Sequence, residues 1–245
     1  MEKSIEIEKI IKAAPKSMQA MLSSIYEYNS RFLIDKEQEK LLSKILFAIQ
    51  HLDRRYFVED DEVYNDYALP ITAGQTISQP STVARMIILA EVEQGDDILE
   101  IGTGSGWNAA LIAYLAYPGH ITSVERIASL KEYAEKNLAK LKGYIKQKKP
   151  EDFQKLSKIN LFADNIFGKG KVWKQRYNKI IFTAGIASEE DEKNVENLAS
   201  NLLKQSGILI CPRVEGKMLI YKKEKFLKRF ETKEDYVFVP LINHE

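Results

Sequence analysis

Apolar residues recur at helical spacing in the first quarter of the chain. Up to about residue 56 the sequence is rich in helix-forming residues, and Leu42, Ile45, Leu46 and Ile49 stand three and four residues apart. This spacing puts apolar side chains on one face of a helix. We therefore expect a helical N-terminal region over residues 1–56 and a larger domain over residues 57–245.

From Asp97 onward the pattern changes to short β-rich runs that alternate with helical ones. This alternation is typical of a parallel sheet covered by helices. Strands are predicted near 97–102, 121–125, 159–163 and 179–183, and helices near 106–117, 127–141 and 189–204.

After Gly207 the pattern indicates strands with little helix between them. These strands are expected near 207–214, 218–222, 226–230 and 237–242. The expected fold class is therefore α/β: a doubly wound, mostly parallel sheet of the Rossmann-like type, with a helical N-terminal region and antiparallel C-terminal strands.

Two segments interrupt the pattern. Between residues 57 and 80 an acidic string is followed by Pro70, Gly74 and Pro80, which indicates irregular backbone. Gly143–Lys158 lies between the second predicted helix and the third strand, and we interpret it as an inserted surface excursion whose charge is solvated.

Composition and charge narrow the choice of partners. The chain has 245 residues, 44% hydrophobic and 29% charged, and its net charge of +1 gives no overall attraction to nucleic acid or anionic membrane. The stretch 131–179 holds fourteen Lys and Arg against five Asp and Glu, a net charge of +9. Because aromatic and Arg residues are sparse there, a solvated basic surface is favoured over a nucleic-acid footprint.

Cysteine usage and hydropathy point to a cytoplasmic protein. Cys211 is the only cysteine, so no internal disulfide can form, and its apolar neighbours favour a buried, inert thiol. The first residues lack the apolar core of a signal peptide. The longest apolar run, Ala109–Tyr117, is far short of the roughly 20 residues of a membrane helix. We expect no membrane partner, no nucleic-acid partner and no metal site.

A glycine-rich turn is the first feature that carries chemistry. The run Ile98–Gly106 is a hydrophobic strand that enters a G-x-G-x-G turn, and a helical run follows it. Glycines let backbone approach a ligand, and the helix start offers unpaired N–H groups. A dinucleotide fingerprint needs its third glycine one residue later, where Trp107 stands. The spacing therefore disfavours a nicotinamide oxidoreductase and favours S-adenosyl-L-methionine, which has no phosphate.

Polar or small residues end the four successive predicted strands. Glu125 ends the second, where a carboxylate can accept hydrogen bonds from both ribose hydroxyls; a surface glutamate is the alternative. Asp164 follows the third and suits the adenine amino group, or else caps a helix. Open α/β sheets bind ligands at the edge formed by the carboxyl ends of their strands, where these residues are expected. The predicted cofactor-binding residues are Glu100, Gly102, Thr103, Gly104, Ser105, Gly106, Glu125, Arg126, Asp164, Asn165 and Thr183.

Three stretches, in this order, resemble protein-L-isoaspartate O-methyltransferases. They are Ala68–Pro80, which contains G-Q-T-I-S-Q-P, then Ile98–Trp107, then Phe182–Gly185. The first is the specific one, because most methyltransferases share the glycine turn but lack the segment before it. The resemblance extends from about Arg55 to Ile242.

The resemblance implies one doubly wound class I methyltransferase domain, S-adenosyl-L-methionine as methyl donor, and isoaspartyl peptides and proteins as acceptors. It matches Ser78 to the family's active-site hydroxyl. The sequence departs from the family at Ala163 and Asn165, where Gly-Asp-Gly is usual, and at Lys217. It also lacks a proline after Thr183 and has no counterpart for residues 143–158.

The chemistry of an isoaspartyl acceptor agrees with the residues present. Its α-carboxylate is already an anion at neutral pH, so methyl transfer needs no general base. Negative charge is lost on the way to the transition state, so neutral donors serve better than a cation. Thr76 and Ser78 can both point at the carboxylate while Ile77 packs inward, because residues two apart in an extended segment face the same way. The alternative is that both hydroxyls only form hydrogen bonds with backbone groups of a turn.

Two other functions stay open from the sequence. One is a different methyltransferase, for example one that acts on tRNA and is recruited by the basic stretch 131–179. The other is a module that keeps the cofactor fold but has lost catalysis. We expect a monomeric carboxyl methyltransferase that starts the repair of isoaspartyl damage.

Overall fold

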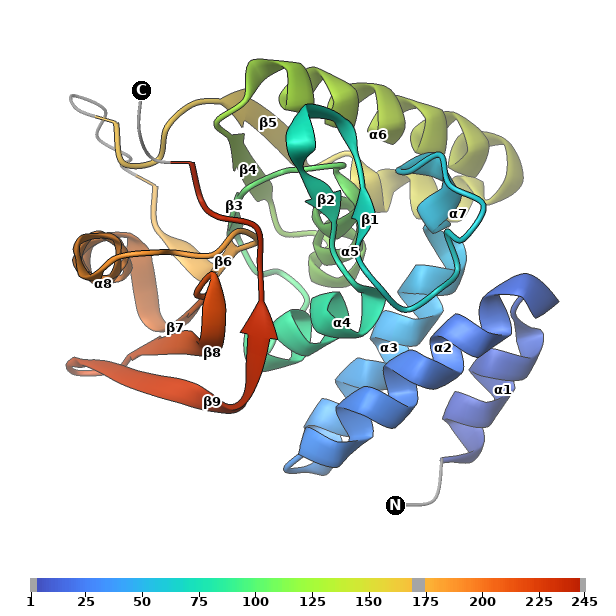
Figure 1. The fold of residues 1–245 in the computed structure, drawn as a ribbon. Helices are drawn as coiled ribbons and strands as arrows, with labels where there is room; N and C mark the ends of the chain where they lie inside the picture. Colours follow the sequence, from blue (N-terminus) through green and yellow to red (C-terminus); the bar gives the residue numbers. More distant parts are fainter. Residues whose placement is uncertain (1–3, 169–174, 243–245) are drawn as a thin grey trace.

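A seven-stranded sheet forms the centre of the computed structural model, which describes residues 4–168 and 175–242 (Figure 1). Strands β3 to β7 run parallel, whereas β8 and β9 are antiparallel. The predicted doubly wound α/β fold with antiparallel C-terminal strands is confirmed. In spatial order the strands are β5 (Ile159–Ala163), β4 (Ile121–Glu125), β3 (Ile98–Ile101), β6 (Tyr177–Phe182), β7 (Leu203–Cys211), β8 (Glu215–Lys223) and β9 (Leu227–Val237).

Helices cover both faces of the sheet, and two hydrophobic clusters fill the space between. One cluster joins the sheet to α4 (Pro80–Leu89), α5 (Trp107–Ala116) and α6 (Ala128–Lys148). The other joins the opposite face to α8 (Glu189–Leu202). Helix α5 is apolar on nearly every side, and nine of its ten residues are buried. A helix that is apolar all round requires burial, so α5 lies in the interior and its N-terminus is held firmly at the sheet edge.

The N-terminal region is helical, as predicted. It comprises α1 (Ile5–Ala13), α2 (Lys16–Asn29), a 3₁₀ turn η1 (Ser30–Phe32) and α3 (Lys36–His51). These helices, in blue in Figure 1, share the first hydrophobic cluster with α4 and α5. Their apolar faces are therefore buried against one another and against α4 and α5.

The segment between α3 and α4 forms short elements. It contains η2 (Arg54–Tyr56), the two-stranded pair β1 (Leu69–Pro70) and β2 (Thr76–Ile77), and η3 (Thr72–Gly74) between them. Ser78 follows β2 directly and precedes α4 by one residue. Pro80 opens α4 at a position where a missing N–H costs nothing.

The predicted strand over 237–242 is wrong. β9 is a single strand of eleven residues that ends at Val237, and the backbone after it is irregular. Pro240 has no N–H to offer to a ladder. Instead, Gly185 N–H donates to Val239 O (2.8 Å) and Leu241 N–H donates to Gly185 O (2.7 Å). These bonds fasten the C-terminal segment to the end of β6.

The segment Gly143–Lys158 lies largely at the surface, as expected, but it is helical and anchored by three buried residues, so it is not the loose excursion that the sequence suggested. Helix α6 continues to Lys148 and is followed by α7 (Pro150–Phe153) and η4 (Gln154–Leu156). Ile145 and Leu156 are buried in the first cluster, and the Tyr114 hydroxyl donates to the buried Asp152 carboxylate (3.1 Å). The high Lys content concealed the few apolar positions that anchor the segment to α5.

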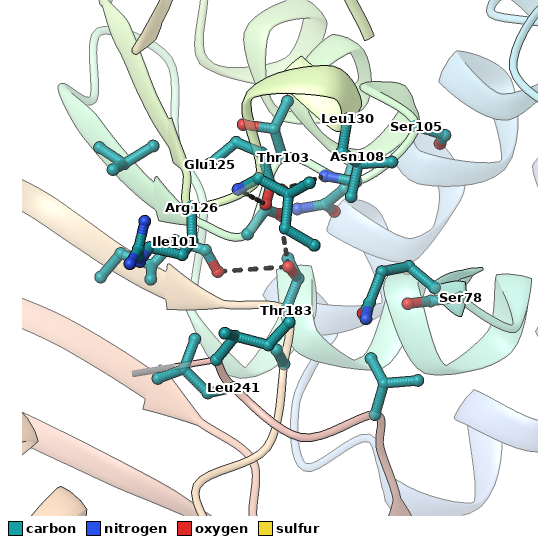
Figure 2. Close-up of a pocket in the computed structure, with 18 of the residues that line it drawn as sticks. Ser78, Ile101, Thr103, Ser105, Asn108, Glu125, Arg126, Leu130, Thr183 and Leu241 are labelled. Atoms are coloured by element: carbon teal, nitrogen blue, oxygen red, sulfur yellow. Dashed lines mark hydrogen bonds between the residues drawn. The ribbon is translucent and has the colours of Figure 1, made fainter. Parts of the chain in front are cut away.

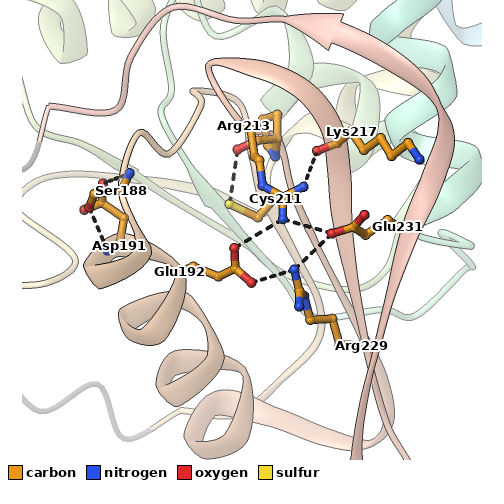
Figure 3. Close-up of polar contacts among 9 residues, drawn as sticks. Ser188, Asp191, Glu192, Cys211, Arg213, Lys217, Arg229 and Glu231 are labelled. Carbon is orange, nitrogen blue, oxygen red and sulfur yellow. Dashed lines mark hydrogen bonds and ion pairs between the residues drawn. The ribbon is translucent and has the colours of Figure 1, made fainter.

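A network of ion pairs fastens the C-terminal hairpin to α8 (Figure 3). Arg213 Nη2 lies 3.2 Å from Glu192 and 2.9 Å from Glu231, and Arg229 Nη2 lies 2.7 Å from Glu192. Nearby Cys211 is fully buried, as predicted, and burial raises the pKa of its thiol well above the usual value. The thiol is therefore protonated and unreactive at neutral pH.

Two kinds of feature are absent from the part of the chain that the structure describes. Within residues 4–168 and 175–242, no helix has the length and hydropathy to cross a membrane. Over the same ranges, no three or more His, Cys, Asp and Glu side chains are grouped so as to hold a metal ion.

Candidate active site

A pocket opens at the carboxyl ends of β3, β4, β5 and β6 (Figure 2). Eleven of the thirteen predicted site residues line it, whereas Glu100 and Gly106 do not. The lining residues are Gln75, Thr76, Ile77, Ser78, Val83, Met86, Ile101, Gly102, Thr103, Gly104, Ser105, Trp107, Asn108, Val124, Glu125, Arg126, Ile127, Leu130, Asp164, Asn165, Ile166, Thr183, Ala184, Val239, Pro240, Leu241 and Ile242.

The glycine turn has a backbone that other residues adopt only at a cost. Gly102, Gly104 and Gly106 have φ values of 95°, 54° and 89°. Gly102 N–H donates to Val124 O (2.8 Å), and a Cβ at Gly102 would overlap the Thr183 hydroxyl. Thr183 in turn donates to the Ile101 carbonyl at 3.2 Å. The turn therefore fits tightly between the ends of β4 and β6 and exposes its backbone to the pocket.

Glu125 lies where the sequence predicts a carboxylate that binds the ribose hydroxyls. Its side chain is 6% exposed, and one carboxylate oxygen accepts from Gly104 N–H (3.0 Å) while the other accepts from Ile127 N–H (3.0 Å). A carboxylate oxygen can accept more than one hydrogen bond. Glu125 can thus stay fixed by the turn and still accept from two hydroxyl groups in the pocket.

Glu100 lies behind the turn instead of in the pocket. Its fully buried carboxylate accepts from Asn108 Nδ2 (2.7 Å) and from the Ser123 hydroxyl. Burial raises the pKa of Glu100 to about 7, because an ionised carboxylate is poorly solvated there. Asn108, which sequence reasoning missed, lines the pocket in its place. Glu100 supports the site through Asn108 and the strand beside it.

Gly106 also lies behind the pocket wall. A Cβ there would come within 3.3 Å of the Ala134 side chain on α6. Gly106 therefore allows close packing between α5 and α6, which is a different task from ligand contact.

We call the part of the pocket formed by residues 101–130 and 164–166 the donor side, because the methyl donor is expected there. Apolar side chains complete it, and sequence reasoning missed them too. Ile101 and Val124 come from strand ends, and Ile127 and Leu130 come from the start of α6. Their place directly beside the predicted strand ends was an available signal. Leu241 also lines the pocket, but it belongs to the C-terminal segment outside this side, and no local pattern could have assigned it. Apolar side chains and Asp164 in one pocket suit an adenine ring with a polar edge.

Asp164 and Asn165, which follow β5, line the pocket as predicted. Asp164 N–H donates to Glu125 O (2.8 Å), and Asn165 N–H donates to the Asp164 carboxylate (2.9 Å). The departures from the family at Ala163 and Lys217 both lie at exposed positions, and neither lines the pocket. Asn165 lines the pocket, and so does Ala184, which follows Thr183 where the family has a proline nearby.

The remaining walls form the acceptor side. They are formed by residues 75–78, in and after β2, and by residues 239–242 of the C-terminal segment. Thr76 and Ser78 are half-buried whereas Ile77 is 3% exposed, which agrees with the predicted alternation. In Figure 2, Ser78 lies across the pocket from Arg126, the one Lys or Arg among the described lining residues. The acceptor side thus offers neutral hydroxyls.

Comparison with known proteins agrees with this geometry. The family model of protein-L-isoaspartate(D-aspartate) O-methyltransferases matches residues 28–245. The protein-L-isoaspartate O-methyltransferase of Ignicoccus hospitalis is 37% identical over 206 residues, which cover 81% of this chain and 88% of the relative. That of Thermosipho melanesiensis is 32% identical over 228 residues, which cover 89% and 100%.

Solved structures show the same fold. A Plasmodium falciparum protein-L-isoaspartate O-methyltransferase in complex with S-adenosyl-L-homocysteine superposes with a TM-score of 0.66 at 22% identity, and the match covers 90% of this chain and 98% of the other. At this identity the likeness concerns the fold.

Proposed function

The chain belongs to the protein-L-isoaspartate(D-aspartate) O-methyltransferase family, and from this premise we propose how its pocket carries out methyl transfer. The protein transfers a methyl group from S-adenosyl-L-methionine to the free α-carboxylate of isoaspartyl residues. The observation that carries the proposal is that the specific segment with Ser78 forms a wall of the same pocket as the glycine turn.

The donor side fits S-adenosyl-L-methionine by its chemistry. Glu125 would accept hydrogen bonds from the ribose hydroxyls, and residues 102–105 would lie along the amino-acid part of the cofactor. Asp164 and Asn165 would lie at the polar edge of the adenine. Ile101, Val124 and Leu130 offer apolar surface to the ring. When bound, the cofactor supplies the electrophilic methyl group. The residues bind it, orient it and keep water away.

The acceptor side would hold the isoaspartyl carboxylate by neutral donors. Ser78 would donate to one carboxylate oxygen, with Thr76 beside it. The carboxylate oxygen then attacks the methyl carbon in line with the departing sulfur, and no proton has to move. A neutral donor orients the oxygen without stabilising the reactant charge as strongly as a cation does.

The product explains why such a reaction repairs damage. The methoxy group of a methyl ester leaves more readily than the oxygen of a free carboxylate. The neighbouring amide nitrogen therefore attacks the ester carbonyl, closes a succinimide ring and releases methanol. Hydrolysis of that ring returns some normal aspartate. The protein is needed only for the methylation step.

The basic stretch does not favour a nucleic-acid acceptor. Among the described residues 131–168 and 175–179, none of the Lys or Arg side chains lines the pocket, and Lys131 forms an ion pair with Glu135 at 2.6 Å. The proposal therefore has a protein acceptor. It further takes residues 1–56 as a helical extension of a methyltransferase domain over 57–245, and a cytoplasmic monomer as the working form.

One assay tests the function. Radiolabelled methyl transfer is measured to an isoaspartyl peptide and to its normal aspartyl twin, with added RNA and with salt from about 50 to 500 mM. We expect labelling of the isoaspartyl peptide alone, nearly independent of RNA and salt. No labelling, with cofactor binding intact by calorimetry, would identify a module that has lost catalysis. Labelling of RNA would identify a different methyltransferase.

A further inference from the structure

Arg54 is a fully buried arginine that touches the acceptor side of the pocket from behind. It opens η2 and is 0% exposed. Among the described residues, its guanidinium donates only to backbone carbonyls, all within residues 63–78. Nη1 donates to Val63 O (2.9 Å) and Asn65 O (3.3 Å), and Nη2 donates to Tyr67 O (3.1 Å), Ser78 O (3.1 Å) and Ile77 O (3.5 Å).

These carbonyls take the place of a counter-ion. Within residues 4–168 and 175–242, no carboxylate forms an ion pair with Arg54, although Asp66 and Asp60 favour its charge from a distance. Burial lowers the pKa of Arg54 to about 10, which still leaves the group charged at neutral pH. A buried charge is costly unless dipoles compensate it. Segment 63–78 is therefore tied to the position of this guanidinium.

The Ser78 hydroxyl depends on its backbone for its direction. Among the hydrogen bonds of the described residues, none involves Ser78 Oγ, whereas Ser78 O is held by Arg54. The carbonyl carbon and Cβ of Ser78 are bonded to the same tetrahedral Cα. When Arg54 fixes the carbonyl, it fixes the position of Cβ, and the hydroxyl can then reach only the positions that rotation about the Cα–Cβ bond allows.

Arg54 also contacts the donor side. Its Cζ lies 5.4 Å from the ring centroid of Trp107, the residue that opens α5 and lines the pocket. Trp107 Nε1 donates to Leu52 O (3.0 Å), two residues before Arg54. The guanidinium thus lies between the indole of the donor side and the carbonyls of the acceptor side.

We propose that Arg54 is a positioning residue for methyl transfer. It holds segment 63–78 against Trp107, so that the Ser78 hydroxyl meets the acceptor carboxylate in line with the methyl group. The inference rests on the proposed function, because it assigns the residue that prepares the Ser78 hydroxyl for that reaction.

The test is a double-mutant cycle on single-turnover methylation of the isoaspartyl peptide. Arg54→Lys keeps the positive charge but offers one nitrogen where the guanidinium offers a planar fork. We expect the rate to fall about 10- to 100-fold, while cofactor affinity by calorimetry changes by less than about threefold. Ser78→Ala should then cost at most about threefold more in the Arg54→Lys background, because its hydroxyl is already misplaced.

Arg85→Lys is the matched control. Arg85 is similarly buried (6% exposed), but its Nε donates to Glu234 (2.7 Å), and no hydrogen bond of the described residues joins it to segment 63–78. Ser78→Ala should keep its full effect in the Arg85→Lys background. A loss of stability common to both arginine variants, measured by urea unfolding, cannot produce this difference.

Three outcomes would overturn the inference. The first is a full, multiplicative effect of Ser78→Ala in the Arg54→Lys background. The second is an Arg54→Lys variant that methylates like the parent. The third is that neither Arg54→Lys nor Arg54→Gln folds, which would make Arg54 a requirement of the fold. A parent protein that does not methylate the isoaspartyl peptide would instead refute the proposed function.

Discussion

The two sides of the pocket are built in different ways. Most of the donor side comes from one continuous stretch, residues 101–130, in which β3, the glycine turn, α5, β4 and the start of α6 follow in order. The acceptor side joins residues 75–78 to residues 239–242, more than 160 residues away. Local geometry fixes the first, whereas Arg54 and the Gly185 backbone hold the second. Substitutions should therefore act differently on the two sides.

The largest effect is expected for Gly102→Ala on the donor side. Its φ of 95° is strained for a residue with a Cβ, and that Cβ would overlap the Thr183 hydroxyl. Together these should cost about 2–5 kcal/mol, divided between folding and cofactor binding. Urea unfolding and calorimetry measure the two parts. Gly143→Ala, which lies on α6 with open space around it, is the control and should be slightly stabilising. Equal behaviour of the two variants would show that the turn tolerates a side chain.

The next effect concerns the pH dependence of stability. Glu100 has a pKa of about 7 in the folded protein, above the value of 4.5 in the unfolded chain. The folded state therefore binds the extra proton, and stability is lost as pH rises from about 5 to 7.5, by roughly 2–3 kcal/mol. Glu100→Gln should remove this loss. Urea unfolding of both proteins at pH 5 and pH 7.5 measures the difference, and parallel pH profiles would contradict the assignment.

Glu125→Ala should weaken cofactor binding by about 1–3 kcal/mol, because the ribose hydroxyls lose a charged acceptor. Calorimetry with S-adenosyl-L-methionine measures this loss. Glu132→Ala, at an exposed position on α6 outside the pocket, serves as the control and should bind normally. Unchanged affinity in a folded Glu125→Ala variant would remove this strand end from the donor side.

The smallest effect is expected for the reverse substitution, Ala73→Gly, in η3 of the hairpin that carries residues 75–78. Ala73 has a φ of 58°, a left-handed backbone that costs a residue with a Cβ about 1–2 kcal/mol. Ala73→Gly relieves this strain but makes the unfolded chain more flexible, so a net stabilisation of about 0.5 kcal/mol is expected. Thermal unfolding checks the sign. A destabilised variant would mean that the Ala73 side chain contributes packing that exceeds the strain.

The sequence predicts the locally built donor side better than the acceptor side, which distant segments form. The glycine turn, Glu125 and Asp164 follow strands with strong local patterns, and the structure brings them to one pocket. The resemblance supplied Ser78, because no periodicity marks residues 75–78. Leu241 and Arg54 could not be assigned, since their contacts come from tertiary packing. The buried anchors of segment 143–158, Ile145 and Leu156, were hidden among its lysines. The backbone expected to form a strand over 237–242 instead bonds to Gly185.

The most direct test measures two properties of the Ser78→Ala variant, its cofactor affinity and its single-turnover methylation of an isoaspartyl peptide. If the two sides are independent, calorimetry should give a cofactor affinity within about threefold of the parent. Methyl transfer should fall by roughly ten- to several hundred-fold, the scale of losing one positioned neutral donor. Ser78→Thr, which keeps a hydroxyl, should retain more activity. A Ser78→Ala protein that turns over like the parent, or one that also loses the cofactor, would contradict the account.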